Sequence, residues 1–305
     1  MKIFLKYIII LTNVYISVYA GYCHSLTFNI APNSDIVGTI QTVVFKEGDT
    51  LPEIARKFDV AITELIDANR NINPKKIKAG TKLIIPTQFI LPPGPKQGIV
   101  LNLAEFRLYF FSKDQKTVTT LPVGIGRLGW KTPLGETTIV RKRENPVWVP
   151  PESIRRYSAS RGKDLPDFIP SGPNNPLGYY AMNLAWTGYL IHGTNAPNSI
   201  GIRSSSGCIR MYPEDIKVLF KLAEIGTSVR VVHEPLKVGK KGNELYLEVH
   251  EAFKEKYYND EDLTEQELFE KIVDEYYQRF KQRIDWSYAN KNLKNAVGYP
   301  IDITD

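Results

Sequence analysis

The stretch from Tyr189 to Pro213 contains two side chains whose types could perform nucleophilic chemistry. His192 follows the apolar run Tyr189–Ile191, which predicts the end of a buried strand, and turn-forming residues come after it. Cys208 follows the small polar run Ser204–Gly207. A histidine at a strand end and a cysteine on a loop beside another element suit a thiol nucleophile and its base.

Thiol chemistry explains why these residue types would occur together. A free thiol has a pKa of roughly 8.5 and is only about a few per cent thiolate at neutral pH, so a neighbour must accept its proton or stabilise the thiolate. Gly207 permits close backbone approach, and its N–H group together with that of Cys208 could face a developing oxyanion. Arg210 could hold a substrate carboxylate in bidentate fashion.

Two other interpretations of the cysteine and the histidine stay open. Composition alone favours a buried structural cysteine and a hydrogen-bonded core histidine. A zinc site fits less well, because only one histidine and one cysteine share the stretch and structural zinc takes four such ligands.

Several apolar or alternating runs predict the strands that would carry these residues, and they predict an all-β core with few helices that ends at Val232. The runs are Gly98–Leu103, Arg107–Phe111, Val118–Val123, Glu136–Arg141 and Tyr179–Leu184. A helix is predicted after Pro213, where apolar residues recur at helical spacing. Aromatic residues near the site are expected in the sheet core or at its rim: Tyr179, Tyr180, Trp186 and Tyr189.

Length and composition indicate a soluble globular protein with two or more domains. The chain has 305 residues, of which 43% are hydrophobic and 24% charged. The net charge is +6, of which Lys2 and Lys6 supply two, and no basic stripe with interleaved aromatic residues argues for nucleic acid.

The first twenty residues, Met1 to Ala20, are typical of a secretory signal peptide, with an uncleaved anchor as the competing interpretation. Export would place the two cysteines in an oxidising compartment. A bridge between Cys23 and Cys208 would silence the nucleophile, so we expect Cys208 to stay reduced and Cys23 to lie in a terminal tail.

Residues 41–86 predict a small module in the order strand, helix, helix, strand. Val43–Phe45 and Gly80–Pro86 are the strands. Thr50 with Glu53 predicts the N-cap of the first helix, Leu51–Phe58. Residues 87–96 include the run Leu-Pro-Pro-Gly-Pro and predict a stiff linker.

Residues 236–305 predict a C-terminal extension. Leu245–Val249 indicates a strand, and Thr264–Glu267 is a capping box that would open one long helix. The apolar positions of this helix would run on to Ile284, which fits packing on a core better than binding of a partner.

The segment His192-Gly-Thr-Asn, followed by Ser205-Ser-Gly-Cys-Ile-Arg-Met211, resembles the signature of the L,D-transpeptidase (YkuD-like) catalytic domain. Further motifs extend this resemblance over about 97–235. Many members carry a second histidine before the Gly-Cys pair, where this chain has Ser206. The role that this second histidine would have in orienting or polarising the site is therefore in doubt for this chain.

Residues 41–86 resemble a LysM module, which implies binding to the N-acetylglucosamine-containing glycan of peptidoglycan. The implied groove is lined by Gly48, Asp49 and Thr50 and by the loop from Asn69 to Ile77. A structural spacer without a ligand is the alternative.

The resemblance implies a mainly β catalytic domain, an L,D-transpeptidase-like β-sandwich, beside a βααβ LysM module and a helical C-terminal extension. It implies that Cys208 attacks the diaminopimelate–D-alanine bond of a tetrapeptide stem and that His192 activates the thiol. Backbone groups of Gly193 and Gly207 would orient the imidazole and stabilise the oxyanion. The resemblance and the residues around the thiol together predict that Ser206 lies beside the nucleophile. Four further side chains are predicted to bind the substrate: Arg210, Ser205, Thr194 and Tyr189.

The implied acyl acceptor is a second stem, giving a 3–3 cross-link, or a lysine of an outer-membrane lipoprotein, giving an anchor. No metal or organic cofactor is implied, and carbapenems are expected to acylate Cys208. The signal peptide and the peptidoglycan substrate predict a periplasmic, wall-associated protein. A wall-binding scaffold with impaired catalysis and an L,D-carboxypeptidase stay open as alternatives.

Overall fold

A computed structural model describes residues 26–254, 264–280 and 283–305 of the chain. The predicted signal segment, Met1 to Ala20, and Cys23 lie outside these residues. Within the described ranges, every helix is too short or too polar to cross a lipid bilayer.

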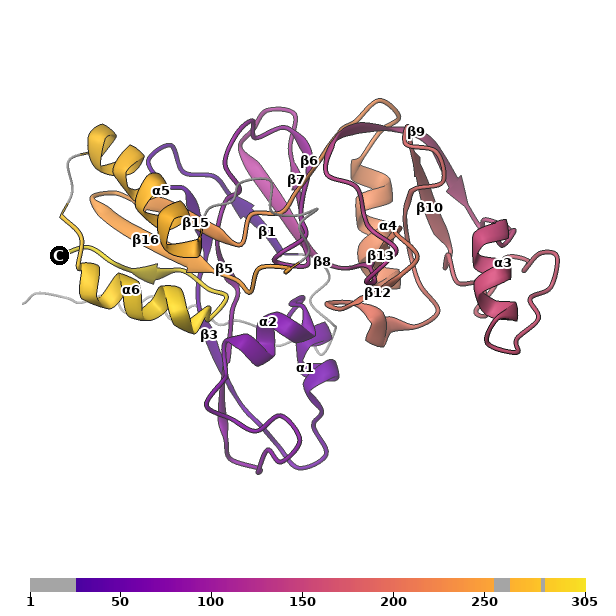
Figure 1. Cartoon of the computed structure of the whole chain (residues 1–305), viewed down its shortest axis with the longest axis horizontal. Coiled ribbons are helices and arrows are strands. Elements are labelled where there is room, and N and C mark those ends of the chain that lie inside the picture. The colour runs from indigo at the N-terminus through magenta and orange to yellow at the C-terminus, as the bar shows by residue number, and fades with distance from the viewer. Residues whose placement is uncertain (1–25, 255–263, 281–282) are drawn as a thin grey trace, which may run out of the picture.

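The described part of the chain is mainly β, and one large sheet occupies the middle of the molecule (Figure 1). Its strands are β1 (Leu26–Asn29), β6 (Gly98–Asn102), β7 (Arg107–Phe111), β8 (Thr117–Gly126), β9 (Gly135–Glu144), β10 (Tyr180–Leu184), β11 (Leu190–His192), β12 (Arg203–Ser205), β13 (Ile209–Met211) and β14 (Ser228–Val232). These elements confirm the strands predicted from the five apolar runs and the end of the core at Val232.

The strand path closes on itself through the long strand β8. Neighbours follow the order β8, β13, β11, β10, β9, β14, β6 and β7, and β7 pairs again with β8. The first half of β8 pairs with β7 along Val118–Pro122, and its second half pairs with β13 at Val123 and Gly124. Aliphatic side chains from these strands fill one core between the two halves of the path. The layer arrangement of a β-sandwich stays a prediction.

Three helical segments lie on this sheet domain. The predicted helix after Tyr212 is α4 (Pro213–Leu222), whose Ile216 and Leu219 are fully buried against the sheet. A short 3-10 turn, Pro197–Ser199, lies between β11 and β12. Helix α3 (Glu152–Ala159), which no periodicity predicted, has no buried residue and stands at the edge of the domain far from α1 and α5 (Figure 1).

The N-terminal module consists of β3 (Gln41–Val44), α1 (Leu51–Lys57), α2 (Ile62–Asp67) and β4 (Lys82–Ile85), and β3 pairs with β4. The predicted N-cap is confirmed, because the Thr50 hydroxyl accepts from the N–H of Glu53 and donates to its carboxylate. Such a cap is worth about 1 kcal/mol.

The segment predicted as a linker, 87–96, is only partly a linker. Gln88–Ile90 forms β5, which pairs with β2 (Ile36–Gly38). Phe89, Ile90 and Leu91 are buried, and the N–H of Ile90 donates to Glu248 at 2.6 Å. The burial of these apolar side chains therefore makes the first part of this segment a strand, and only the proline-containing part after Leu91 connects the domains.

The C-terminal extension forms a second small sheet covered by two helices. The sheet contains β15 (Leu236–Lys241), β16 (Glu244–Val249) and β17 (Ile301–Asp302), and the helices are α5 (Glu265–Phe280) and α6 (Trp286–Asn295). The capping box of Thr264 and Glu267 is confirmed. The prediction of one helix running to Ile284 is wrong: Ile284 bridges Thr304, and Asp285 caps a new helix by accepting from Tyr288.

The three parts of the chain are joined by ionic contacts, of which those of Arg107 and Lys237 are buried and that of Arg56 is partly exposed. Arg107 of the sheet domain donates to both carboxylate oxygens of Glu64 in α2, at 2.7 and 2.6 Å. Arg56 of α1 makes a bidentate pair with Glu214 of α4, at 2.6 and 2.8 Å. Lys237 of β15 contacts Glu105 at 2.8 Å. Figure 1 shows α1 and α2 below the sheet and α5 and α6 to one side of it.

Candidate active site

Two neighbouring parallel strands bring the predicted nucleophile and base to one face of the sheet. In the β11–β13 register, Ile191 lies opposite Ile209 and His192 lies opposite Arg210. Partners in a ladder share a face, so Arg210 projects on the same side as His192, and Cys208 lies directly before β13. All three line one cavity of about 470 Å³.

The ring of His192 is held in a defined tautomer. Its Nδ1 lies 2.6 Å from the carbonyl oxygen of Gly193, and a carbonyl can only accept, so Nδ1 carries the proton of the neutral ring and Nε2 has a free lone pair. Burial, together with the nearby charges of Arg210 and Arg143, lowers the pKa of His192 to about 4. The imidazole is therefore neutral near pH 7 and able to accept a proton.

The thiol of Cys208 is also held in its neutral form. Burial raises the pKa of this thiol, although the N–H of Leu190 and the charge of Arg210 oppose that effect. Its Sγ donates weakly to the carbonyl of Gly188 at 3.6 Å, and Cys208 is a free cysteine. A neutral thiol beside a neutral imidazole suits general-base activation better than a resting thiolate–imidazolium pair.

Hydrogen bonds fix the shape of the loop Ser205–Cys208, which carries the predicted nucleophile and is called the nucleophile loop below. The hydroxyl of Ser205 donates to the carbonyl of Cys208 at 2.5 Å and accepts from the N–H of Gly207 at 3.1 Å. Gly207 has φ +102° and packs against Tyr189, where a Cβ atom would come within 2.9 Å of the ring. Because its N–H is occupied by Ser205, the expected oxyanion role of Gly207 is corrected, and the N–H of Cys208 is the remaining candidate of the two.

Thr132 is a buried supporting residue that sequence reasoning missed. Its hydroxyl donates to the carbonyl of Gly207 at 2.9 Å and accepts from the N–H of Gly126 at 3.1 Å. It thus ties the nucleophile loop to the end of β8. A threonine 76 positions before the cysteine carries no local signal of this contact.

The remaining predicted residues divide into two groups. Ser206 and Tyr189 line the cavity, as the sequence led us to expect. Gly193 orients the imidazole through its carbonyl, as predicted for its backbone. Thr194 is buried and its hydroxyl accepts from the N–H of Ala196 at 3.0 Å, so it shapes the loop and does not line the cavity. The substrate-binding role predicted for Thr194 is corrected accordingly.

The outer wall of the cavity comes from the segment around α3. Trp148, Val149 and Pro151 line it together with Ser153 and Ile154 of the helix. The helix is held by a stack that includes the cavity-lining Trp130: the ring of Tyr157 lies edge-on to Trp130, with centroids 5.8 Å apart, and the guanidinium of Arg127 lies over both rings.

In the N-terminal module, the residues predicted at the glycan groove serve the local backbone. The carboxylate of Asp49 accepts from the N–H of Lys46 at 2.8 Å, Thr50 caps α1, and Gly48 has φ +85° with open space around it. The amide of Asn69 is buried and bonds the backbone of Leu65 and, twice, of Ile84. Its side chain joins α2 to β4 and also lines a small hollow with Ile72 and Ile77, so the glycan-binding role of Asn69 stays a prediction.

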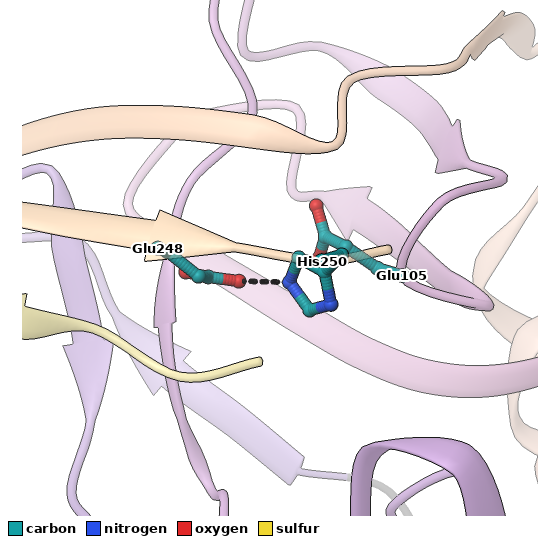
Figure 2. A group of neighbouring side chains, drawn as sticks. All are labelled: Glu105, Glu248 and His250. Atoms are coloured by element: carbon teal, nitrogen blue, oxygen red, sulfur yellow. Dashed lines mark hydrogen bonds and ion pairs between the residues drawn. The ribbon is translucent and has the colours of Figure 1, made fainter. Parts of the chain in front are cut away.

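A second cluster of titratable groups lies away from the cavity, between the sheet domain and β16 (Figure 2). Glu105, Glu248 and His250 have ligand atoms within 4.8 Å of one another, and His250 Nε2 is 2.8 Å from Glu248. The ammonium of Lys237 lies 2.8 Å from Glu105 and 2.9 Å from Glu248. The lysine supplies the positive charge that these carboxylates need, so the cluster acts as a structural ion network.

The fold and the cavity define a mainly β protein with a neutral histidine at the end of one strand and a free cysteine directly before the neighbouring strand. Comparison with protein families matches residues 96–231 to the L,D-transpeptidase catalytic domain, YkuD, and residues 43–86 to the LysM domain. The chain belongs to the L,D-transpeptidase family and carries an N-terminal LysM domain.

Curated relatives support this membership. The probable L,D-transpeptidase YcfS of Escherichia coli is 43% identical over 72% of this chain and 71% of its own length. The probable L,D-transpeptidase ErfK/SrfK of Escherichia coli is 37% identical over 92% and 91%. Among solved structures, L,D-transpeptidase 3 from Mycobacterium tuberculosis matches 49% of this chain and 66% of its own, with 19% identity and a TM-score of 0.33.

Proposed function

We propose that the chain is a peptidoglycan L,D-transpeptidase in which Cys208 is the nucleophile and His192 its general base. The observation that carries the proposal is the placement of a free thiol and an imidazole with a free Nε2 in one cavity. The relatives are named L,D-transpeptidases, and this name supplies the reaction class. A peptidoglycan substrate agrees with the presence of a LysM domain.

The proposed reaction has two acyl-transfer steps. Sγ of Cys208 attacks the carbonyl carbon of diaminopimelate at its bond to D-alanine, and the thiol proton passes to Nε2 of His192. The N–H of Cys208 faces the oxyanion. The C–N bond then breaks, the leaving D-alanine amine takes the proton, and a thioester remains. An amine acceptor attacks the thioester, forms a new amide bond and releases the thiol.

The acceptor is an amine of a second stem, which gives a 3–3 cross-link, or a lysine of an outer-membrane lipoprotein, which gives an anchor. We propose that the LysM domain binds the glycan and that the protein works at the cell wall after export to the periplasm. Residues 97–235 would be the catalytic domain and 236–305 an extension that packs on it.

The test is mass spectrometry of the protein with a disaccharide-tetrapeptide. Release of D-alanine, with a thioester on Cys208 or a cross-linked dimer, is expected. Cys208→Ala should abolish both products, and His192→Gln should slow them by about 10²- to 10⁴-fold. Full D-alanine release by Cys208→Ala contradicts the proposal.

Two observations favour an alternative function with impaired catalysis. Ser206 stands where many members have a second histidine, and burial raises the pKa of the Cys208 thiol. A wall-binding scaffold with impaired catalysis would bind glycan without releasing D-alanine. An L,D-carboxypeptidase would release D-alanine at the same rate with and without an amine acceptor, and would form no cross-linked product.

A further inference from the structure

The cavity around Cys208 has a one-sided charge. Of its lining residues, the charged ones are Arg143 and Arg210, beside the neutral His192, and none of those described is an aspartate or a glutamate. Two guanidinium groups without an acidic partner in the same cavity favour an anionic ligand. Arg210 was predicted from its place after the cysteine, whereas Arg143 is 65 positions away from it in sequence.

The sheet register places the two arginines on either side of the histidine. Arg143 lies opposite Ala181, Ala181 lies opposite His192, and His192 lies opposite Arg210. Residues in one such row share a face, and adjacent strands are about 4.8 Å apart, so the Cα atom of Arg143 is roughly 10 Å from that of His192. Ala181 adds only a methyl group between them.

The side chain of Arg143 is not engaged as a structural arginine would be. Its Nε is buried and has no hydrogen-bond partner among the described residues. Arg107 shows what a structural arginine looks like in this chain: it is fully buried, makes a bidentate pair with Glu64 and also donates to Thr120. A buried donor without a partner costs free energy unless a ligand satisfies it.

We propose that Arg143 is a specificity-determining residue that binds a second carboxylate of the stem peptide, remote from the bond that is cleaved. Arg210 lies on β13, which begins directly after Cys208, so it lies nearer the thiol and the leaving D-alanine. Arg143 lies two strands beyond His192, where a carboxylate further along the acyl donor would reach it. This inference rests on the proposed function and adds the part of the donor that the cavity recognises.

Two carboxylates of the donor have the required chemistry: the free carboxylate of the second residue and the side-chain carboxylate of diaminopimelate. Two peptides, each amidated at one of these positions, separate them. The acylation step alone is measured, as D-alanine release in a single turnover with enzyme in excess over peptide, so that attack on the thioester by a second stem does not enter.

Arg143→Gln is expected to lower kcat/KM for the unmodified peptide by about 10- to 100-fold, mainly through KM, because a charge-assisted bidentate contact is lost. Amidation of the recognised carboxylate should lower the wild-type value by a similar factor and leave the variant unchanged. Arg143→Lys should recover part of the loss. Arg141→Gln is the matched control, because Arg141 is on the same strand but does not line the cavity, and it should leave kcat/KM unchanged.

An equal loss for Arg143→Gln on all three peptides, or no loss on any, overturns the inference. Binding of the same peptides to Cys208→Ala, with and without Arg143→Gln, gives an answer that does not need turnover. If the wild type releases no D-alanine, the proposed function fails, and the binding data still decide whether Arg143 discriminates the carboxylate. The role of Arg143 is supported if amidation of the peptide or Arg143→Gln weakens binding. It is contradicted if all the peptides bind equally well with and without Arg143→Gln.

Discussion

His192 and Cys208 are both kept neutral by burial, which fixes the order in which protons can move. The lone pair of His192 Nε2 is available because Nδ1 is committed to the carbonyl of Gly193. The pKa of the Cys208 thiol is raised, so few molecules carry a resting thiolate. In the reaction that we propose, proton transfer therefore accompanies attack on the substrate carbonyl.

The first prediction concerns the pH dependence of acylation. The pKa of His192 is lowered from its ordinary value to about 4, so the base loses its lone pair only when the pH falls toward 4. We expect kcat/KM for D-alanine release to be nearly constant from pH 7 to about pH 5 and to be halved near pH 4. Circular dichroism over the same range checks that the fold persists. An acidic limb between pH 6 and 7 would contradict the neutral-base assignment.

The same residue also affects stability. The pKa of His192 is lower in the folded state than in the unfolded chain, so the unfolded chain binds more protons between about pH 6.5 and pH 4. Its contribution to the free energy of unfolding is thus lost as the pH falls through that window. His192→Gln should flatten this part of the curve.

The second prediction concerns Thr132. Replacing its hydroxyl in Thr132→Val leaves the carbonyl of Gly207 and the N–H of Gly126 without a partner, at a cost of about 1 to 3 kcal/mol. We expect a lower free energy of urea unfolding and at least about a tenfold lower kcat, because the loop that carries Cys208 loses its anchor. Thr137→Val is the matched control: the hydroxyl of Thr137 is buried without a partner, so its removal should be neutral or stabilising.

At the scale of elements, helix α3 contributes to the wall of the cavity without belonging to the core. It has no buried residue, and the stack of Arg127, Trp130 and Tyr157 holds it in place. An aromatic pair and a cation–π contact are each worth about 1 kcal/mol, so α3 is only weakly fixed.

The third prediction follows from that weak attachment. Tyr157→Ala should raise KM for the tetrapeptide about three- to tenfold and leave kcat nearly unchanged, because the wall is less ordered while the residues at the thiol are untouched. The free energy of unfolding should fall by about 1 to 2 kcal/mol, because the aromatic pair and the cation–π contact of Tyr157 are both lost. Ser158→Ala on the same helix serves as control. A large fall in kcat with constant KM would show that α3 acts on the chemistry.

Which elements the sequence could predict depends on how local their signals are. The strands from the five apolar runs, the strand that ends at His192 and the caps at Thr50 and Thr264 rest on neighbouring residues and were predicted, whereas β1, β12 and β13 were not. Asp285 was a local N-cap signal that we overlooked, and the apolar run Phe89 to Leu91 was a strand signal before the prolines. Helix α3 has only Ile154 and Tyr157 on its apolar face, and such a short pattern did not lead us to predict a helix.

The site was predictable only in part, for the same reason. Cys208, His192, Ser206 and Arg210 share one stretch of sequence, and all line the cavity. Arg143 enters the cavity through a row of strand partners, which depends on strand order and register rather than on sequence spacing. Likewise, only the three-dimensional structure shows that Ser205 occupies the N–H of Gly207.

At the scale of the whole molecule, the ion pair of Arg107 and Glu64 joins the sheet domain to the LysM domain. Both side chains are almost completely buried, with exposures of 0% and 3%. Removing one partner of such a pair leaves an uncompensated buried charge.

The fourth prediction tests that pair. Glu64→Ala should lower the free energy of urea unfolding by about 3 to 5 kcal/mol, and Arg107→Met combined with Glu64→Leu should recover most of the loss. Arg70→Ala is the control, because its ion pair with Asp67 is partly exposed and worth about 0 to 1 kcal/mol. If the double variant lost the sum of the single effects, the two side chains would not act as a pair.

A second buried contact between the two domains should make their association depend on pH. Asp59 of the LysM domain and Asp215 of α4 are both buried and share a hydrogen bond, which lowers the pKa of Asp59 and raises that of Asp215. Burial raises the pKa of Asp59 to about 7 and that of Asp215 well above its usual range. Near neutral pH the contact therefore retains a proton that the unfolded chain has lost.

The fifth prediction follows from the sign of this shift. The folded state holds the proton of Asp59 up to about pH 7, whereas the unfolded chain releases it near pH 3.8, so the contribution of Asp59 to stability declines as the pH rises through that window. Asp59→Asn should therefore become more stable than the wild type as the pH increases from 4 to 8. Thermal unfolding at each pH measures this difference. Asp164→Asn, at an exposed position, should show none, and a pH-independent difference for Asp59→Asn would mean that the buried carboxyl is already ionised.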